Sequence, residues 1–256
     1  MRIVSWFSAG AASAVATKLA ISKAKDKGWE IVVVRIDVPE EHPDNTRFAR
    51  DCEAWFGQEI LVRQSAIFDS CQSVWERKHY MSGIAGAPCT THMKRDVRKI
   101  FEMEYRPDIQ VFGYTVEEKK RVAAFRMNNP EIGLVCPLID ASLTKQDCHA
   151  AIAQAGIEMA AMYKLGFKNN NCIGCVKDQS PKGWNLVRTH FPEIFAARAK
   201  LSRQLGVRLV KTTTGNRPRL FLDELPPDDF TGETPSTECS ILCHAAVGEQ
   251  TTRGAG

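Results

Sequence analysis

The sequence predicts an α/β fold: a doubly wound, mostly parallel sheet of five strands, followed by a smaller helical region that carries cysteines. Through the first 140 residues, short β-branched or apolar runs alternate with segments of helical periodicity. This alternation is typical of strand–helix–strand units in a parallel sheet. The first run ends in a turn of small residues, 8–13, and beyond residue 140 the alternation stops.

Each element of the predicted sheet domain has a local signal. Residues 30–37 are a β-branched run after Gly28, as expected of a buried parallel strand. Residues 44–56 have helical spacing, with Asp44 or Asn45 placed to cap the helix. The expected strands are the run before Ser8, 30–37, 59–63, 109–113 and 134–138; the expected helices are 12–27, 44–56, 68–80, 90–105 and one that opens at 117–121.

The second region has its own signals for where helices, loops and turns begin and end. Thr144, followed three residues later by Asp147, predicts a capped helix over 144–154. Beyond it we expect a polar loop at 168–177, a helix at 181–205 broken near Pro192, and a hairpin of 208–212 with 219–222. The polar chain from 226 onward is expected to be disordered unless something anchors it. We therefore divide the chain into a nucleotide-binding domain, 1–140, a helical and cysteine-bearing region, 141–245, and a disordered tail, 246–256.

Composition excludes some classes of function. The net charge of +4, from 34 basic and 30 acidic residues, is too mild to imply nucleic acid by itself but suits an anionic substrate. No segment approaches the roughly 20 apolar residues that cross a bilayer. The nine cysteines cannot all pair within one chain, so reduced thiols, metal binding or redox chemistry are expected. We expect a cytoplasmic protein that does not enter membranes.

The small-residue turn at 8–13 predicts an anion site. A strand that passes through a tight turn into a helix aims several backbone N–H groups at one point, most often at phosphate. Gly10 permits a positive φ or a close backbone approach, while the hydroxyls of Ser8 and Ser13 add donors. The alternative is that these residues are small only because they pack closely.

Four features together resemble the PP-loop superfamily of adenine-nucleotide alpha hydrolases, and within it the phosphoadenylyl-sulfate (PAPS) reductase branch, over roughly residues 1–245. They are the 8–13 turn, Asp37 after the second strand, the tripeptide 42–44, and residues 113–118 after the fourth strand. The resemblance implies a Rossmann-like fold that binds an adenine nucleotide. It implies phosphate contacts for Ser8, Gly10 and Ser13, adenosine contacts for Ile36 and Asp37, and a rim formed by Gly113, Tyr114 and Glu118 with Arg121 nearby.

One departure bears on the nucleotide. The ATP-cleaving form of this loop reads Ser-Gly-Gly-Lys-Asp-Ser, and Ala11 and Ala12 stand where it has Lys and Asp. Without the lysine, less charge neutralises a leaving pyrophosphate, and without the aspartate one magnesium ligand is missing. PAPS or adenylyl sulfate is therefore favoured over ATP, while ATP and Mg²⁺ stay open.

The cysteines point to a metal centre. Cys172 and Cys175, with Gly174 between them, have the compact spacing of zinc or iron–sulfur ligands, although a redox pair has the same spacing. Reductases of the resembling branch that bind a 4Fe-4S cluster carry a Cys-Cys pair some eighty residues before Cys-x-x-Cys. Here only Cys89 matches that pair, which leaves three ligands and implies a fourth from the tail.

The tail supplies two further thiols. Glu238 and Cys239 resemble the Glu-Cys-Gly motif that carries the nucleophilic thiolate in those reductases, although Ser240 replaces the glycine. We assign catalysis to Cys239 and Cys243, and Cys243 also as the fourth metal ligand; which thiol is ligand and which nucleophile stays open. The other cysteines, Cys52, Cys71, Cys136 and Cys148, lie on predicted helices or a strand and are each expected to be a core or inert thiol.

A basic helix follows Cys89. Lys94, Arg95, Arg98 and Lys99 either form a solvated face or, with Arg121, bind the substrate's phosphate or sulfate. Lys211, Arg217 and Arg219 could extend this positive surface towards nucleic acid.

Three functions remain in competition. The first is a PAPS reductase-like iron–sulfur enzyme that uses a thioredoxin-like reductant. The second is an ATP-dependent sulfurtransferase that takes sulfur from a donor and thiolates tRNA, DNA or a small acceptor. The third is a non-catalytic nucleotide- or nucleic-acid-binding protein with structural zinc. A homo-oligomer is compatible with all three.

Overall fold

The computed structural model describes residues 1–83, 86–212 and 219–234. They contain a five-stranded parallel sheet in the order β3-β2-β1-β4-β5, which confirms the doubly wound α/β fold. The strands are β1 (Arg2–Trp6), β2 (Glu30–Ile36), β3 (Ile60–Arg63), β4 (Ile109–Val111) and β5 (Leu134–Val135). The strand order reverses between β1 and β4, and the crevice at such a switch point is where ligands bind in open α/β sheets.

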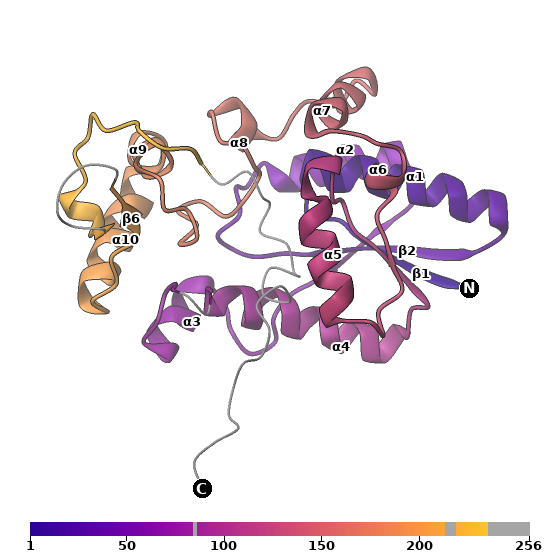
Figure 1. Ribbon diagram of the computed structural model, residues 1–256, viewed down its shortest axis with the longest axis horizontal. Coiled ribbons are helices and arrows are strands. Elements are labelled where there is room, and N and C mark those ends of the chain that lie inside the picture. Colours follow the sequence, from indigo (N-terminus) through magenta and orange to yellow (C-terminus); the bar gives the residue numbers. More distant parts are fainter. Residues whose placement is uncertain (84–85, 213–218, 235–256) are drawn as a thin grey trace, which may run out of the picture.

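Helices cover both faces of the sheet (Figure 1). On one face lie α1 (Ala11–Lys27), α2 (Asn45–Phe56) and α7 (Lys145–Gln154), whose shared core includes Phe7, Phe48 and Ile152. On the other face lie α4 (Asp96–Tyr105) and α5 (Lys119–Asn128), packed through Trp6, Phe101 and Phe125. The Thr144 hydroxyl accepts from the Asp147 amide at the start of α7, which confirms the predicted cap.

Several boundaries differ from the sequence-based expectation. The strand expected over 134–138 ends at Val135, because Pro137 lacks an N–H and opens the short helix α6 (Pro137–Asp140). The helix expected over 68–80 is α3 (Cys71–Lys78), capped by the Ser70 hydroxyl. The basic helix expected over 90–105 begins with a π-helical segment, η1 (Thr90–Arg95), before continuing as α4.

The C-terminal lobe has two short helices or turns that the sequence did not indicate, α8 (Ala161–Lys164) and η3 (Leu222–Glu224). The predicted break near Pro192 is confirmed, since α9 (Pro181–His190) ends two residues before α10 (Pro192–Gln204) begins. The predicted hairpin is confirmed in the described residues by the antiparallel pair β6 (Val210–Lys211) and β7 (Arg219–Leu220).

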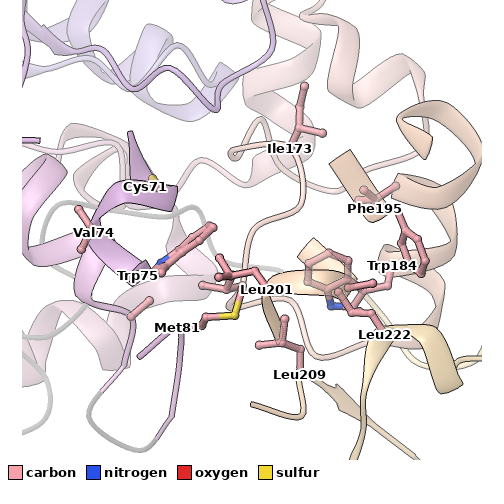
Figure 2. Packing of buried hydrophobic residues seen from close by; sticks show 14 of the residues in the cluster. Cys71, Val74, Trp75, Met81, Ile173, Trp184, Phe195, Leu201, Leu209 and Leu222 are labelled. Carbon is pink, nitrogen blue, oxygen red and sulfur yellow. The ribbon is translucent and has the colours of Figure 1, made fainter. Parts of the chain in front are cut away.

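Helix α3 shares its core with this lobe although it precedes the fourth strand in sequence. In Figure 2, Val74 and Trp75 of α3 lie in one apolar cluster with Trp184, Leu201 and Leu222. Figure 1 accordingly places α3 at the same end of the molecule as α9 and α10. The lobe therefore packs on an element inserted between the third and fourth strands. None of the helices in the described ranges is long and apolar enough to span a membrane.

Candidate functional site

The residues expected to bind the nucleotide lie at the carboxyl edge of the sheet. Ser8 and Gly10 follow β1, Asp37 follows β2, and Gly113 and Tyr114 follow β4. The turns after β1 and β4 flank the switch point, so the fold brings the residues of the resemblance to one edge. Near β4, an added short turn, η2 (Val116–Glu118), precedes α5.

The turn after β1 gathers hydrogen-bond donors on a single oxygen. The Ser8 amide and hydroxyl lie 3.1 and 3.0 Å from Ser13 Oγ, and the Gly10 amide lies 3.3 Å from the same atom. These groups sit at the N-terminus of α1, where backbone N–H groups and the helix dipole favour an anion. The turn therefore presents the donors that a phosphate oxygen requires.

The backbone of this turn differs from the expectation in one respect. The positive φ, 56°, belongs to Ala9, whereas Gly10 is extended with a φ of −101°. Ala11 and Ala12, in the places of the lysine and aspartate of ATP-cleaving loops, are both buried in the apolar core under α1. Neither position therefore brings a charged side chain to the phosphates.

Gly113 allows β4 to approach α1 closely. A Cβ built at Gly113 would lie 2.6 Å from both Cα and N of Ser13, closer than real Cβ atoms come to backbone. The residues after it form a packed unit: the Arg121 guanidinium lies 5.1 Å from the centre of the Tyr114 ring, and Arg121 pairs with Glu118 at 2.8 Å. A Glu118 carboxylate oxygen also accepts from the Thr115 amide at 3.3 Å.

A buried ionic network follows β2. Arg35 pairs with Asp37 at 2.6 Å and with Glu41 at 3.3 Å, and Lys94 pairs with Glu41 at 3.2 Å. Lys94 is buried, so the solvated-face interpretation is wrong for it. It is also wrong for Arg98, which is buried and pairs with Glu102 at 3.2 Å.

An asparagine pair connects this network to the phosphate turn. The Asn45 amide donates to Glu41 at 3.1 Å, and the buried Asn170 donates to Asn45 Oδ1 and to the Ala9 carbonyl, both at 2.7 Å. Asn170 belongs to the loop 168–177 that carries Cys172 and Cys175. The cysteine loop is therefore hydrogen-bonded to the turn expected to hold phosphate. Nothing in the sequence singled out Asn170 except its place beside the Cys-x-x-Cys pair.

Four cysteines line one pocket: Cys71, Cys89, Cys172 and Cys175, together with Glu40, Trp75 and Lys94 among others. Three of these cysteines were expected to lie together. The fourth, Cys71, was expected to be a core or inert thiol. It is buried in the core, as expected, and it also lines this pocket beside three other thiols. Hydrogen bonding with the thiols of Cys172 and Cys89, together with burial, raises the pKa of the Cys71 thiol. Cys71 lies 18 residues before Cys89 in sequence, a spacing that matches no metal motif and gave no signal.

Local backbone geometry holds these thiols in place. Cys71 is the first residue of α3, and Cys89 occupies the cap position before η1. Gly174 has a φ of 64°, the left-handed region that glycine adopts without strain, so the loop turns sharply between the paired cysteines. The Ile173 amide donates to the Glu40 carbonyl at 2.8 Å, which anchors the loop beside the turn after β2.

Buried cations adjoin the cysteine pocket. Lys94 lines it, and Arg198 of α10 carries a charge that interacts with Cys71, Cys172 and Cys89. Arg198 stacks over Trp75 at 4.5 Å, hydrogen-bonds Gln72 Oε1 at 3.0 Å and leaves its buried Nε without a hydrogen-bond partner. Burial lowers the pKa of this guanidinium. Arg198 therefore places a buried guanidinium beside the thiols of the pocket.

The side chains around the pocket can be matched to the metal centre that the sequence implies. In the part of the chain that is described, no three His, Cys, Asp or Glu side chains are arranged to hold a metal ion. An iron–sulfur cube differs from a single ion, because each of its thiolates binds a separate iron and the thiolates need not converge on one point. Four thiols around one pocket, with adjoining buried cations, fit that group.

The two tail cysteines, Cys239 and Cys243, lie outside the described residues. The chain before them is fixed near the cysteine loop: Thr234 is buried and lines a second pocket with Cys172 and Cys175. Glu233 also pairs with Lys168 of that loop. Cys239 follows Thr234 by five residues, a span of at most about 18 Å.

The remaining cysteines behave as expected. Cys52, Cys136 and Cys148 are fully buried in the cores on either face of the sheet. Burial raises the pKa of Cys52 and of Cys136 to about 12, so neither thiol ionises near neutral pH.

Comparison with known protein families finds one match on this chain. Residues 2–181 match the phosphoadenosine phosphosulfate reductase domain. The match covers the whole sheet, α3 and the loop of Cys172 and Cys175. No curated protein matches the chain.

Proposed function

Because the chain belongs to the phosphoadenosine phosphosulfate reductase family, a PP-loop family of adenine-nucleotide-binding proteins with sulfonucleotide-related functions, we propose that it is an iron–sulfur enzyme that reduces a sulfonucleotide with a thiol. The observation that carries the proposal is that one loop serves two sites. Asn170 contacts the phosphate turn through the Ala9 carbonyl, while Cys172 and Cys175 of the same loop line the cysteine pocket.

The nucleotide is held at the carboxyl edge of the sheet. Ser8, Gly10 and Ser13 donate to its phosphates, Ile36 and Asp37 lie beside adenosine, and Gly113, Tyr114 and Glu118 form the rim. Lys94, Arg95 and Arg121 supply positive charge for the substrate anion. For Lys94 and Arg121 this charge is shared with Glu41 and Glu118, so they act within ion-pair networks rather than as isolated cations.

In the proposed reaction, the tail supplies the attacking thiol. The Cys239 thiolate attacks the sulfur of the sulfonucleotide, the bond from that sulfur to the phosphate oxygen breaks, and the nucleotide leaves with the electron pair. Cys239 then carries a sulfonate. A thiol of a thioredoxin-like partner attacks the Cys239 sulfur, which releases sulfite and leaves a disulfide. Two thiols are oxidised and the transferred sulfur gains two electrons, so the step balances. This role is supported by Thr234, which lines a pocket with Cys172 and Cys175 and precedes Cys239 by only five residues.

The 4Fe-4S cluster is held by Cys89, Cys172 and Cys175 with one further thiol. When bound, it supplies a charged, redox-active group beside the nucleotide site and fixes the loop of Cys172 and Cys175. The residues around it keep that environment largely closed to water, since Met93, Ile173 and Val176 are buried in the wall of the pocket.

Reduction is favoured over ATP-dependent sulfur transfer by the first turn. Activation by ATP requires neutralisation of a leaving pyrophosphate, and the two positions that carry Lys and Asp in ATP-cleaving loops are here buried alanines. A sulfonucleotide loses no pyrophosphate in the proposed step, so the turn needs only to bind phosphate.

The test is an anaerobic assay of the full chain with PAPS or adenylyl sulfate and a dithiol reductant. We expect sulfite and the adenosine nucleotide in equal amounts, and loss of both products in Cys239→Ser. The buried Cys148→Ser is the matched control and should retain activity.

Two outcomes would overturn the proposal. Thiolation of an acceptor that depends on ATP and releases no sulfite would identify a sulfurtransferase. Nucleotide binding without either reaction, in protein that contains zinc instead of iron, would identify a non-catalytic binding protein.

A further inference from the structure

We infer that Cys71, at the first position of α3, is the fourth ligand of the iron–sulfur cluster, so that neither tail cysteine is needed to hold it. This inference rests on the proposed function, because it concerns the ligands of the same cluster. It replaces the expectation that Cys243 completes the set.

Geometry carries the inference. The Cys71 side chain reaches the same pocket as Cys89, Cys172 and Cys175, and its thiol is within hydrogen-bonding reach of Cys172 and Cys89. The other buried cysteines differ: Cys52 and Cys148 lie in the core between the sheet and helices α1, α2 and α7. Cys136 lies in the core on the other face. Of the buried cysteines in the described ranges, Cys71 is thus distinguished by its thiol neighbours and not by its burial.

The surrounding elements hold Cys71 at this position. Cys71 opens α3, whose first turn is capped by the Ser70 hydroxyl. Arg198 faces the same group of thiols from α10 and is held there by Gln72, the next residue of α3. The Gln72 backbone N–H donates to a Glu40 carboxylate oxygen at 3.2 Å, so the first turn of α3 is also tied to a residue that lines the pocket.

The inference also explains the departure from the family's Cys-Cys pair. Proline occupies the position before Cys89, so the second ligand of the pair is missing in sequence. Helix α3 brings Cys71 to Cys89 in space instead, because Trp75 and Val74 bury this helix against the C-terminal lobe (Figure 2). Both tail thiols then remain for sulfur chemistry.

The experiment compares iron and sulfide content of four anaerobically reconstituted full-length proteins. They are the wild type, Cys71→Ser, the double variant Cys239→Ser with Cys243→Ser, and Cys148→Ser as the control for loss of a buried thiol. We expect about four irons per chain in the wild type, the double tail variant and the control, with identical electron paramagnetic resonance spectra. Cys71→Ser is expected to lose at least a quarter of its iron and to show a 3Fe-4S signal.

The outcomes separate the assignment of Cys71 from the proposed cluster itself. Iron lost from the double tail variant, with Cys71→Ser unchanged, overturns the assignment of Cys71 and leaves the proposed function standing. A wild type without iron, or with zinc in its place, overturns the proposed cluster itself. If Cys71→Ser fails to fold, the double tail variant still decides, because full iron retention without either tail thiol leaves Cys71 as the ligand.

Discussion

At the scale of single residues, Gly113 shows how packing and binding are joined at the switch point. Alanine at this position would place its Cβ 2.6 Å from the backbone of Ser13. Because the contact is with backbone atoms, the clash is relieved only if β4 or α1 moves. We expect Gly113→Ala to lower the free energy of unfolding by about 1–3 kcal/mol, the usual cost of overpacking, and to weaken nucleotide binding.

Urea unfolding measures this effect, and Gly206→Ala is the matched control. Gly206 has a φ of 67° with nothing within 4 Å of its added Cβ, so alanine there costs only the backbone strain of about 1 kcal/mol. Nucleotide affinity equal to wild type in Gly113→Ala would show that the close approach of β4 to α1 does not shape the site.

The buried cysteines give a second residue-scale prediction. Because burial raises the pKa of Cys52 and Cys136 to about 12, their thiolate fraction at neutral pH is negligible. We expect iodoacetamide to leave both unmodified in the folded protein and to modify both after denaturation, as read by peptide mass spectrometry. Fast labelling of either in the native state would contradict their place in the core.

At the scale of elements, the loop 168–177 links the two halves of the site. Asn170→Ala removes the hydrogen bonds to the Ala9 carbonyl and to Asn45, and a lost buried hydrogen bond costs about 1–3 kcal/mol. We expect binding of adenosine 3′,5′-bisphosphate, measured by calorimetry, to weaken about tenfold, or about 1.4 kcal/mol.

The control is Asn129→Ala, which removes a similar amide-to-carbonyl hydrogen bond, 2.9 Å to Phe125, at the end of α5. It should leave affinity unchanged. If both asparagine variants lower stability alike and neither changes affinity, the contact of Asn170 with the phosphate turn is structural only.

Some elements could be predicted from the sequence and others could not. A β-branched run located β2, the capping pair Thr144 and Asp147 located α7, and small residues located the phosphate turn, because these signals are local. The end of β5 was predicted three residues late, since an apolar run continues through Pro137 into α6. Cys71 was assigned to the core because it lies on a predicted helix, and it is buried there, but its thiol neighbours depend on how α3 packs against the lobe.

At the scale of the whole molecule, the nucleotide edge and the cysteine pocket adjoin through consecutive glutamates. Glu40 lines the cysteine pocket and holds the loop at Ile173, while Glu41 pairs with Arg35 and Lys94 beside the nucleotide edge. The proposed cluster would join three separate stretches of chain at this junction. Metal binding to such a site is coupled to folding.

Removal of the metal should therefore loosen one part of the molecule selectively. After chelation under anaerobic conditions, we expect a lower melting temperature and faster amide hydrogen exchange in α3 and the loop 168–177. Exchange in β1 and α1 should stay slow, because their core is formed by the sheet and its covering helices. Uniform loosening of the whole chain would contradict a local role for the metal.

The most direct test of the central claim is to look for the sulfonated enzyme. Full-length protein is mixed with PAPS or adenylyl sulfate without reductant, quenched, digested and analysed by mass spectrometry. The proposed reduction predicts a sulfonate on the peptide that contains Cys239, formed with an equal amount of released nucleotide and discharged as sulfite when a dithiol is added. An intact sulfonucleotide and an unmodified tail, in protein that has bound both nucleotide and cluster, would contradict it.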